Sequence, residues 1–218
     1  MKNLYIYCEG QTEEAFVNEI LYPYFLNVEI CVYPIICSTK RRLNKKFKGG
    51  VTNYEKIRSE LKAICRQHKN ELVTTMFDYY GMPADTPSIE CSEVDLLKRM
   101  EFIEDAIGSD IDEQNCVFHL MLHEFEALLF SEPQVFFLIG GEAAVKAIQE
   151  ICNNYETPEH INNSVETAPS KRIEKIIPNY AKVKNGVLLS QDIGIDKMMA
   201  ACPHFKKWIE RIIEVTRD

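Results

Sequence analysis

The sequence predicts an α/β fold, a mostly parallel four-stranded sheet flanked by helices, with a helical C-terminal addition. Apolar runs alternate with helical patterns through the first 130 residues, which is typical of βαβ units. The first run, over 3–8, lacks polar alternation, as expected of a strand buried on both faces of a parallel sheet. Beyond residue 130 the pattern becomes helical. We therefore expect an α/β domain over 1–130 and a helical C-terminal extension over 131–218 that packs on it.

The first domain is expected to contain four strands with helices between them. The strands are predicted at 3–8, 28–37, 72–77 and 116–122. The first helix starts near residue 13, where acidic side chains suit the helix dipole, and Pro23 kinks or ends it. Thr52 and Glu55 form a capping box for a second helix that runs to about 69. Ser92 is the expected cap of a third helix that runs to about 107.

The second part of the chain is expected to be helical, with one long loop. Gly140 and Gly141 interrupt its first helix, because glycine disfavours a helix interior. Residues 156–170 have little apolar content and form a loop of unusual length. The expected helices start at Ser131, resume over 142–153, and follow at about 171–177 and 194–214, the last kinked near Pro203.

Composition narrows the class of protein. With 218 residues, 46% of them hydrophobic, the chain has enough apolar content for a real core. No run approaches the ~18 apolar residues of a membrane-spanning helix. The N-terminus lacks the layout of a signal peptide, so we expect a cytoplasmic protein with no membrane partner. Eight cysteines without a CxxC pair favour reduced, buried thiols over a disulfide scaffold or a cysteine zinc cluster.

The charge distribution bears on nucleic-acid binding. A net charge of −8 argues against indiscriminate binding to nucleic acid, but it leaves room for a local site. Basic residues crowd the segment 40–48, and Lys171, Arg172 and Lys175 form a second group. Each group is either a solvated surface or a phosphate contact. Because Ser170 is a candidate N-cap, Lys171 and Arg172 are expected at a helix N-terminus, which suits phosphate.

Acidic side chains follow three of the predicted strands. Glu9 comes after the first strand, Asp78 after the third, and Glu124, beside His123, after the fourth. Because ligands bind at the carboxyl ends of parallel strands, we expect these carboxylates to converge on one edge of the sheet. Gly10 lets the backbone turn tightly after Glu9. Such oxygen ligands suit Mg²⁺ (or Mn²⁺), which activates water and stabilises the leaving oxygen of a phosphodiester.

Several segments also carry a family resemblance. Glu9-Gly10-Gln11-Thr12-Glu13 resembles the EGxTE motif of Toprim domains, particularly those of the overcoming-lysogenization-defect nucleases. The matching segments are EGQTE at 9–13, FDYYGMP at 77–83, HEFEALLF at 123–130, PSKRI at 169–173 and CPHF at 202–205. Together they resemble an uncharacterised bacterial family of Toprim-like proteins, known only as a domain of unknown function.

The resemblance to Toprim enzymes implies roles at the strand ends. Glu9 would act as the general acid or base and also bind the metal ion. Asp78 matches the first aspartate of the DxD motif that holds Mg²⁺ in those enzymes, whereas Tyr80 stands at the second position. From its position alone, Glu124 or Glu126 supplies the missing oxygen.

A further set of residues is expected to touch the substrate. By analogy with a late lysine of the related nucleases, Lys171 would be a catalytic contact to the scissile phosphate. Tyr80 either stacks on a base or packs in the core, and His123 is either functional or a hydrogen-bonded core residue. The complete set of expected substrate-binding residues is Gly10, Thr12, Tyr80, His123 and Arg172.

These observations lead to one principal functional hypothesis and two alternatives. The principal one is a Mg²⁺-dependent enzyme that cleaves phosphodiester bonds of nucleic acid, in phage defence together with an ATPase. No GxxxxGK[ST] motif is present, so the ATPase would be a separate partner. The alternatives are a non-catalytic regulatory subunit with a degenerate site, and a phosphoryl or nucleotidyl transferase acting on a small nucleotide. The sequence does not distinguish a DNA substrate from an RNA substrate, and it leaves open whether the protein forms a homo-oligomer.

Overall fold

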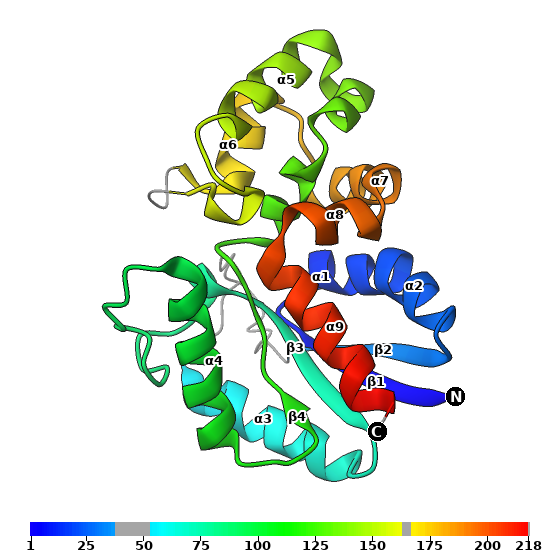
Figure 1. Cartoon of the computed structure of the whole chain (residues 1–218), viewed down its shortest axis with the longest axis vertical. Helices are drawn as coiled ribbons and strands as arrows, with labels where there is room; N and C mark the ends of the chain where they lie inside the picture. Colours follow the sequence, from blue (N-terminus) through cyan, green and yellow to red (C-terminus); the bar gives the residue numbers. More distant parts are fainter. Residues whose placement is uncertain (38–52, 163–166, 218) are drawn as a thin grey trace, which may run out of the picture.

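A parallel sheet organises the molecule (Figure 1). The computed structural model describes residues 1–37, 53–162 and 167–217. Its strands are β1 (Lys2–Cys8), β2 (Ile30–Ile36), β3 (Leu72–Asp78), β4 (Cys116–Val117) and β5 (Leu120–Met121). The order is β2-β1-β3-β4, with β5 also paired to β3, and every pairing is parallel. The predicted α/β fold is therefore confirmed.

The two faces of the sheet are covered by different helices. Alternate residues of β1 point to opposite faces: Leu4 and Ile6 join one apolar cluster, and Tyr7 joins the other. The first face is covered by α1 (Gln11–Phe16), α2 (Tyr22–Leu26) and α9 (Pro203–Arg217), and the second by α3 (Tyr54–Gln67) and α4 (Leu96–Ile111). This burial on both faces explains why the strands lack polar alternation.

The remaining C-terminal helices lie mostly beyond the sheet. They are α5 (Phe137–Cys152), α6 (Pro169–Ile176), α7 (Lys182–Ile193) and α8 (Ile195–Ala201). In Figure 1, α5 and α6 gather at one end of the molecule, and α9 returns to run along the sheet. There the Trp208 indole Nε1 donates a 2.9 Å hydrogen bond to Thr74 Oγ1 of β3. The last helix of the chain thus completes the core that β1 and β3 begin.

The predicted single strand over 116–122 is divided into β4 and β5 in the structure. The cause lies in the side chain of Thr75 on the neighbouring strand. Its Oγ1 accepts a hydrogen bond from His119 N at 2.8 Å and donates one to His119 O at 2.7 Å. Because a side chain satisfies both main-chain groups of His119, the backbone ladder is interrupted there and resumes at Leu120.

Several helix boundaries differ from the sequence prediction. Ser92 does not cap α4; Asp95 does, and its Oδ1 accepts hydrogen bonds from Leu97 N and Lys98 N. For α3 the N-cap is Asn53, whose Oδ1 accepts from Lys56 N. The expected cap Thr52 and the basic segment 40–48 lie outside the described residues.

Proline and glycine explain most of the other differences. Pro23 does not end the first helix, because a π-helical turn over Val17–Leu21 precedes it and the proline falls in the first turn of α2. Gly141, with φ of 64°, produces the expected break within α5. The helix expected over 194–214 is two helices, α8 and α9, that meet before Pro203. The helix α7 was not predicted at all.

A helix that crosses a bilayer must be long and largely apolar. Within the described ranges, every helix is too short or too polar to cross a bilayer.

Candidate functional site

The predicted strand-end carboxylates lie at adjacent positions on the sheet. Glu9 follows β1, and Asp78 is the last residue of β3, the strand next to β1. Met121 of β5 lies opposite Asp78, and Glu124 follows three residues later. The sheet order therefore brings all three carboxylates to one edge, as the parallel-strand argument predicted.

Hydrogen bonds to the main chain fix these side chains. Glu9 Oε2 accepts from Asp78 N at 3.3 Å, and Asp78 Oδ1 accepts from Phe125 N at 2.9 Å. The turn after β3 packs closely on Glu9, since a Cβ at Gly81 would lie 2.7 Å from Glu9 Oε2. Glu9 is thus held by the end of β3 and the turn after it, and Asp78 is held by the segment after β5. Gly81, which has no Cβ, allows the turn to approach Glu9 closely.

Two further carboxylates join the same edge. Glu13, in the first turn of α1, is buried and accepts a 2.9 Å hydrogen bond from Gly10 N. Glu126 is buried in the 3₁₀ segment Phe125–Ser131, only 1% exposed, and its Oε1 lies 3.0 Å from Lys182 Nζ. We call Glu9, Glu13, Asp78, Glu124 and Glu126 the acidic cluster.

The pKa values record how strongly these charges interact. Burial, followed by the charges of Glu13, Glu9, Glu126 and Glu124, holds the pKa of Asp78 well above its ordinary value. Burial is also the main reason that the pKa values of Glu9, Glu13 and Glu126 are raised, although Lys182 acts to lower all three. Burial alone would lower the pKa of Lys182, but Glu126 and Glu124 outweigh it and raise that pKa. The cluster is thus deficient in positive charge.

The acidic cluster has the donor type that suits a hard divalent cation, although no three of its carboxylates, among the described residues, bring an oxygen each to within 4.8 Å of one another. Carboxylate oxygens on neighbouring strand ends are the ligands that Mg²⁺ prefers, and a bound cation removes the cost of ionising them together. Glu9, Asp78 and Glu124 are only partly buried, so solvent reaches them. The hydroxyl of Tyr180 is buried without a hydrogen-bond partner among the described residues. Its pKa is raised by burial and then by Glu126 and Glu124, which places this unsatisfied group beside the cluster.

His123 and Tyr80 lie together next to Glu124. Their rings stack with centroids 5.0 Å apart and planes at 19°, and Tyr80 N donates to His123 O at 3.4 Å. His123 has a positive φ of 69°, an uncommon backbone conformation for a side chain with a Cβ. Both ring nitrogens are buried without partners in the described structure, and burial lowers the pKa of His123 to about 4. Tyr80 itself is 43% exposed, so it is not a core residue.

The start of α6 touches the acidic cluster, but through the main chain. Ser170 N donates a 3.0 Å hydrogen bond to Glu124 Oε2. Ser170 is not the N-cap, which is Ala168. Lys171 is exposed and its Nζ lies 2.6 Å from Glu174 Oε2, so this ammonium already has a carboxylate neighbour on its own helix.

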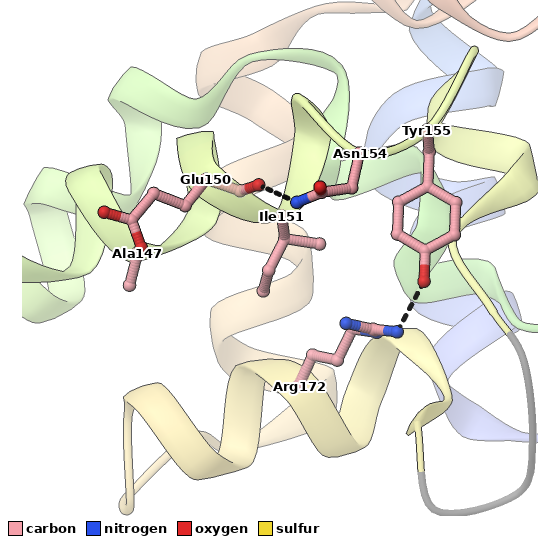
Figure 2. A pocket seen from close by; sticks show the side chains of 6 residues that line it. All are labelled: Ala147, Glu150, Ile151, Asn154, Tyr155 and Arg172. Atoms are coloured by element: carbon pink, nitrogen blue, oxygen red, sulfur yellow. Dashed lines mark hydrogen bonds between the residues drawn. The ribbon is translucent and has the colours of Figure 1, made fainter.

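Arg172 lies on the other side of α6, where α5 and α6 border a shallow hollow (Figure 2). Its Nε donates to Thr167 O at 2.7 Å, and a terminal nitrogen donates to the Tyr155 hydroxyl at 2.6 Å. Figure 2 shows the guanidinium pointing toward Tyr155. These contacts hold α6 against the end of α5. The other two expected substrate contacts, Gly10 and Thr12, lie at the N-cap and in the first turn of α1, beside Glu9 and Glu13.

A second group of ionisable side chains was not expected from the sequence. Glu104 of α4, His119 between β4 and β5, and His204 of α9 bring one ligand atom each to within 4.8 Å of one another. Among the described residues this buried Glu–His–His triad, as we call it, is the group whose geometry can hold a metal ion. The identity of the metal is a separate question.

The residues that the sequence analysis missed were Lys182 and the triad. Lys182 is the first residue of α7, a helix that was not predicted, and nothing local distinguishes it from other lysines of the chain. His204 lies within the CPHF segment, one of the five that carry the family resemblance, and this segment is the signal that could have identified it. Glu104 and His119 lie outside all of those segments.

Comparison with known proteins places the chain in a family. No curated protein and no solved structure matches the chain. A family model described as a domain of unknown function (DUF4276) matches residues 8–213, which include both the acidic cluster and the triad. The expected membership of a family of unknown function is confirmed by this match, while the relation to Toprim domains stays a prediction. The chain belongs to the DUF4276 family.

Proposed function

We propose that the acidic cluster is the active site of a Mg²⁺-dependent enzyme that cleaves phosphodiester bonds of nucleic acid. The observation that carries the proposal is the convergence of acidic side chains from three neighbouring strand ends and two helical segments on one edge, with Lys182 as the cation that pairs with them. Raised carboxylate pKa values gathered in one place are typical of functional sites.

Each carboxylate has a distinct place in this proposal. Asp78 and Glu124 are the principal oxygen ligands, and a bound Mg²⁺ would supply Lewis-acid activation of the phosphodiester. Glu9 is the general acid or base, because its Oε2 is held beside the Asp78 main chain and its pKa is raised, chiefly by burial. Glu126 and Glu13 compensate for the missing second aspartate at Tyr80.

We assign the phosphate contact to Lys182. Its Nζ lies 3.0 Å from Glu126 Oε1, and Glu126, Glu124 and Asp78 all act to raise its pKa. Lys171, which the sequence suggested for the same role, pairs with Glu174 instead. The two lysines therefore form a matched pair for experiment, one inside the acidic cluster and one on the surface of α6.

An exposed aromatic ring and the acidic character of the chain support the proposed substrate class. Tyr80 is exposed beside His123, so its ring is available for stacking on an unpaired base. The net charge of −8 disfavours a long duplex contact by this chain alone. A separate ATPase partner, a second copy of the chain and a role in phage defence remain parts of the proposal that rest on family analogy.

The decisive experiment measures cleavage and metal binding together. Wild-type protein, Glu9→Gln, Asp78→Asn and Lys182→Met are each incubated with plasmid, single-stranded DNA and RNA in Mg²⁺ or Mn²⁺. Loss of a general acid or base group predicts a rate loss of about 10²- to 10⁴-fold for Glu9→Gln. Calorimetric Mg²⁺ titration should show binding by wild type and none by Asp78→Asn. Lys171→Met is the control and should cleave at the wild-type rate.

The outcomes separate the candidate functions. If wild type binds neither Mg²⁺ nor Mn²⁺ and both acid variants behave like wild type, the proposal is wrong. The second candidate, a non-catalytic subunit, then remains, and it is favoured by Tyr80 at the second position of the DxD motif. If Lys171→Met abolishes cleavage and Lys182→Met does not, the assignment of the phosphate contact is wrong. Turnover of mononucleotides without cleavage of polymers would instead indicate a nucleotidyl or phosphoryl transferase.

A further inference from the structure

The Glu–His–His triad joins three elements that are remote in the sequence. Glu104 Oε1 lies 3.2 Å from His119 Nδ1 and 3.0 Å from His204 Nε2. The side chains are 14%, 3% and 4% exposed, respectively, so water has little access. All three side chains meet between α4, the β4–β5 segment and the start of α9.

Glu104 Oε1 is crowded by donors. Besides the two imidazoles, it accepts a 2.7 Å hydrogen bond from Leu120 N. A carboxylate oxygen has two lone pairs, so a third hydrogen bond to the same atom is poorly directed. With both imidazoles neutral and one lone pair of each turned inward, a cation between them and Glu104 would take the place of the protons that crowd Glu104 Oε1. The convergence of these three ligand atoms on one point is what favours a bound cation.

The imidazole rings are held in the orientation that such a cation needs. His119 is clamped by Thr75 through its main chain, and its ring stacks on Trp208 with centroids 4.4 Å apart and planes at 8°. The carboxylate of Glu159 fixes the start of α9 by accepting from His204 N and Phe205 N, each at 2.9 Å. The ring of His204 also stacks on that of His119, with centroids 4.8 Å apart and planes at 28°.

The ligand types select the metal. Two imidazole nitrogens and one carboxylate form the His₂Glu set that is common for zinc, whereas Mg²⁺ prefers oxygen ligands alone. Imidazole also suits copper, iron and nickel, but Zn²⁺ has no geometric preference from its d electrons and adapts to a preformed site. The triad and the acidic cluster therefore differ in the metal that they fit.

We propose that Glu104, His119 and His204 bind a Zn²⁺ ion that ties α4 and α9 to the sheet. The three protein ligands leave one tetrahedral position for water. Because both histidines are buried, the ion would meet no large substrate, and its effect is to link the three elements. The site is independent of the proposed phosphodiesterase activity, since no member of the acidic cluster belongs to it.

The test is the metal content and the metal-dependent stability of the full-length protein. Wild type purified without chelator should contain about one Zn²⁺ per chain, in keeping with a dedicated site. Co²⁺ added to the metal-free protein should give the visible absorption of four-coordinate cobalt without a thiolate charge-transfer band, which excludes the cysteines as ligands. Removal of Zn²⁺ by a chelator should lower the melting temperature.

Substitutions of the two histidines test whether the ion binds at the triad. His119→Gln and His204→Gln should each weaken Zn²⁺ binding by more than about 100-fold, since loss of a partner outside the ligand set already costs 10- to 100-fold. The matched control is His68→Gln, which removes an imidazole from another His–Glu pair, 3.3 Å from Glu71, and should leave Zn²⁺ binding unchanged. Asp78→Asn should also retain Zn²⁺.

The proposal is overturned by any of three results. Folded wild type that neither binds Zn²⁺ nor changes its melting temperature with Zn²⁺ or chelator would make the triad a hydrogen-bonded network. Loss of Zn²⁺ in Asp78→Asn but not in the histidine variants would place the ion in the acidic cluster. A thiolate band with Co²⁺ would place it on cysteine. Because the first and third tests use wild type, they hold even if a histidine variant does not fold.

Discussion

The acidic cluster and the Glu–His–His triad lie beside the same strand, β3, but their charges are balanced in opposite ways. At the end of the strand, Asp78 faces like charges and burial, and its pKa is raised well above the ordinary value. Three residues earlier, Thr75 holds His119 against Glu104. Burial acts to raise the pKa of Glu104, but His204 and His119 overcome it and lower that pKa to about 2.

The difference teaches what each group contributes to the fold. In the metal-free triad, His204 and His119 face Glu104 and lower its pKa, so the carboxylate is compensated from within the protein and the loss of one partner is costly. In the acidic cluster the compensation is incomplete, so repulsion among its carboxylates destabilises the fold there, and the proposed cation would relieve that repulsion. Residual stability cost of this kind is typical of functional sites rather than of structural ones.

The largest expected effect is a loss of stability when Glu104 of the triad is replaced. Glu104→Gln should lower the free energy of unfolding by about 3 kcal/mol, because it removes one charge from a buried, paired group. Glu101→Gln is the matched control on the same helix. Its carboxylate pairs with Lys207 at 2.7 Å but is exposed, so the loss should stay below about 1 kcal/mol. Urea denaturation measures both; equal losses would show that the triad is not compensated internally.

The next effect is stabilisation of the acidic cluster by Mg²⁺. At a Mg²⁺ concentration of 100 times its dissociation constant, wild type should gain about 2.7 kcal/mol of stability. Asp78→Asn should gain nothing, and without divalent cations it should melt above wild type, because it relieves the repulsion around Asp78. Thermal melting in chelator and in Mg²⁺ measures both. A lower melting temperature for the variant in chelator would contradict the charge argument.

The pH dependence sharpens the comparison further. The pKa values of Glu9, Glu13 and Glu126 are raised above the ordinary 4.5, so the folded protein binds more protons than the unfolded chain above that pH. The contribution of the cluster to stability is therefore complete below pH 4.5 and is lost as pH rises through the raised values. Mg²⁺ should flatten this decline.

Glu104 has the opposite dependence. Since its pKa is lowered to about 2, its contribution to stability is present above its unfolded pKa and is lost only as pH falls toward 2.

Between pH 5 and pH 8 the acidic cluster therefore sets the pH dependence. Chemical denaturation over this range in chelator should show declining stability in wild type and a shallower decline in Asp78→Asn. Identical slopes for the two proteins would mean that Asp78 and its neighbours do not set the dependence.

The smallest expected effect comes from Gly81. A Cβ there would lie 2.7 Å from Glu9 Oε2, at the far end of a flexible side chain, so Gly81→Ala should displace the Glu9 carboxylate without unfolding the protein. We expect Mg²⁺ affinity to fall about tenfold, which corresponds to about 1.4 kcal/mol. Calorimetric titration measures it. Gly108→Ala is the control, because its Cβ would meet open space on α4.

Much of the fold could be predicted from local patterns. The strands over 3–8 and 72–77 were placed correctly, because a run buried on both faces is apolar throughout. The helix α7 was missed, and its neighbours α8 and α9 were merged into one. Local periodicity resolves neither short helices nor the residue at which one helix gives way to the next.

The candidate site was predicted only where a strand end defined it. Glu9, Asp78 and Glu124 lie together because the order of parallel strands brings their ends to one edge. Lys171 was named by analogy with a late lysine of the related nucleases, and Lys182 was not considered, because only the packing of α7 brings it to the acidic cluster. The functional roles of these residues stay predictions until the variants are measured.

The sequence by itself determined the α/β class, the apolar strands and the acidic groups that follow them, since all of these depend on neighbours in the chain. Only the tertiary structure decided that Lys182 enters the acidic cluster and that Glu104, His119 and His204 meet. Those contacts depend on how α4, α7 and α9 pack against a sheet formed largely by the first half of the chain. Packing between remote segments leaves no periodic trace in the sequence, and so it becomes visible only in three dimensions.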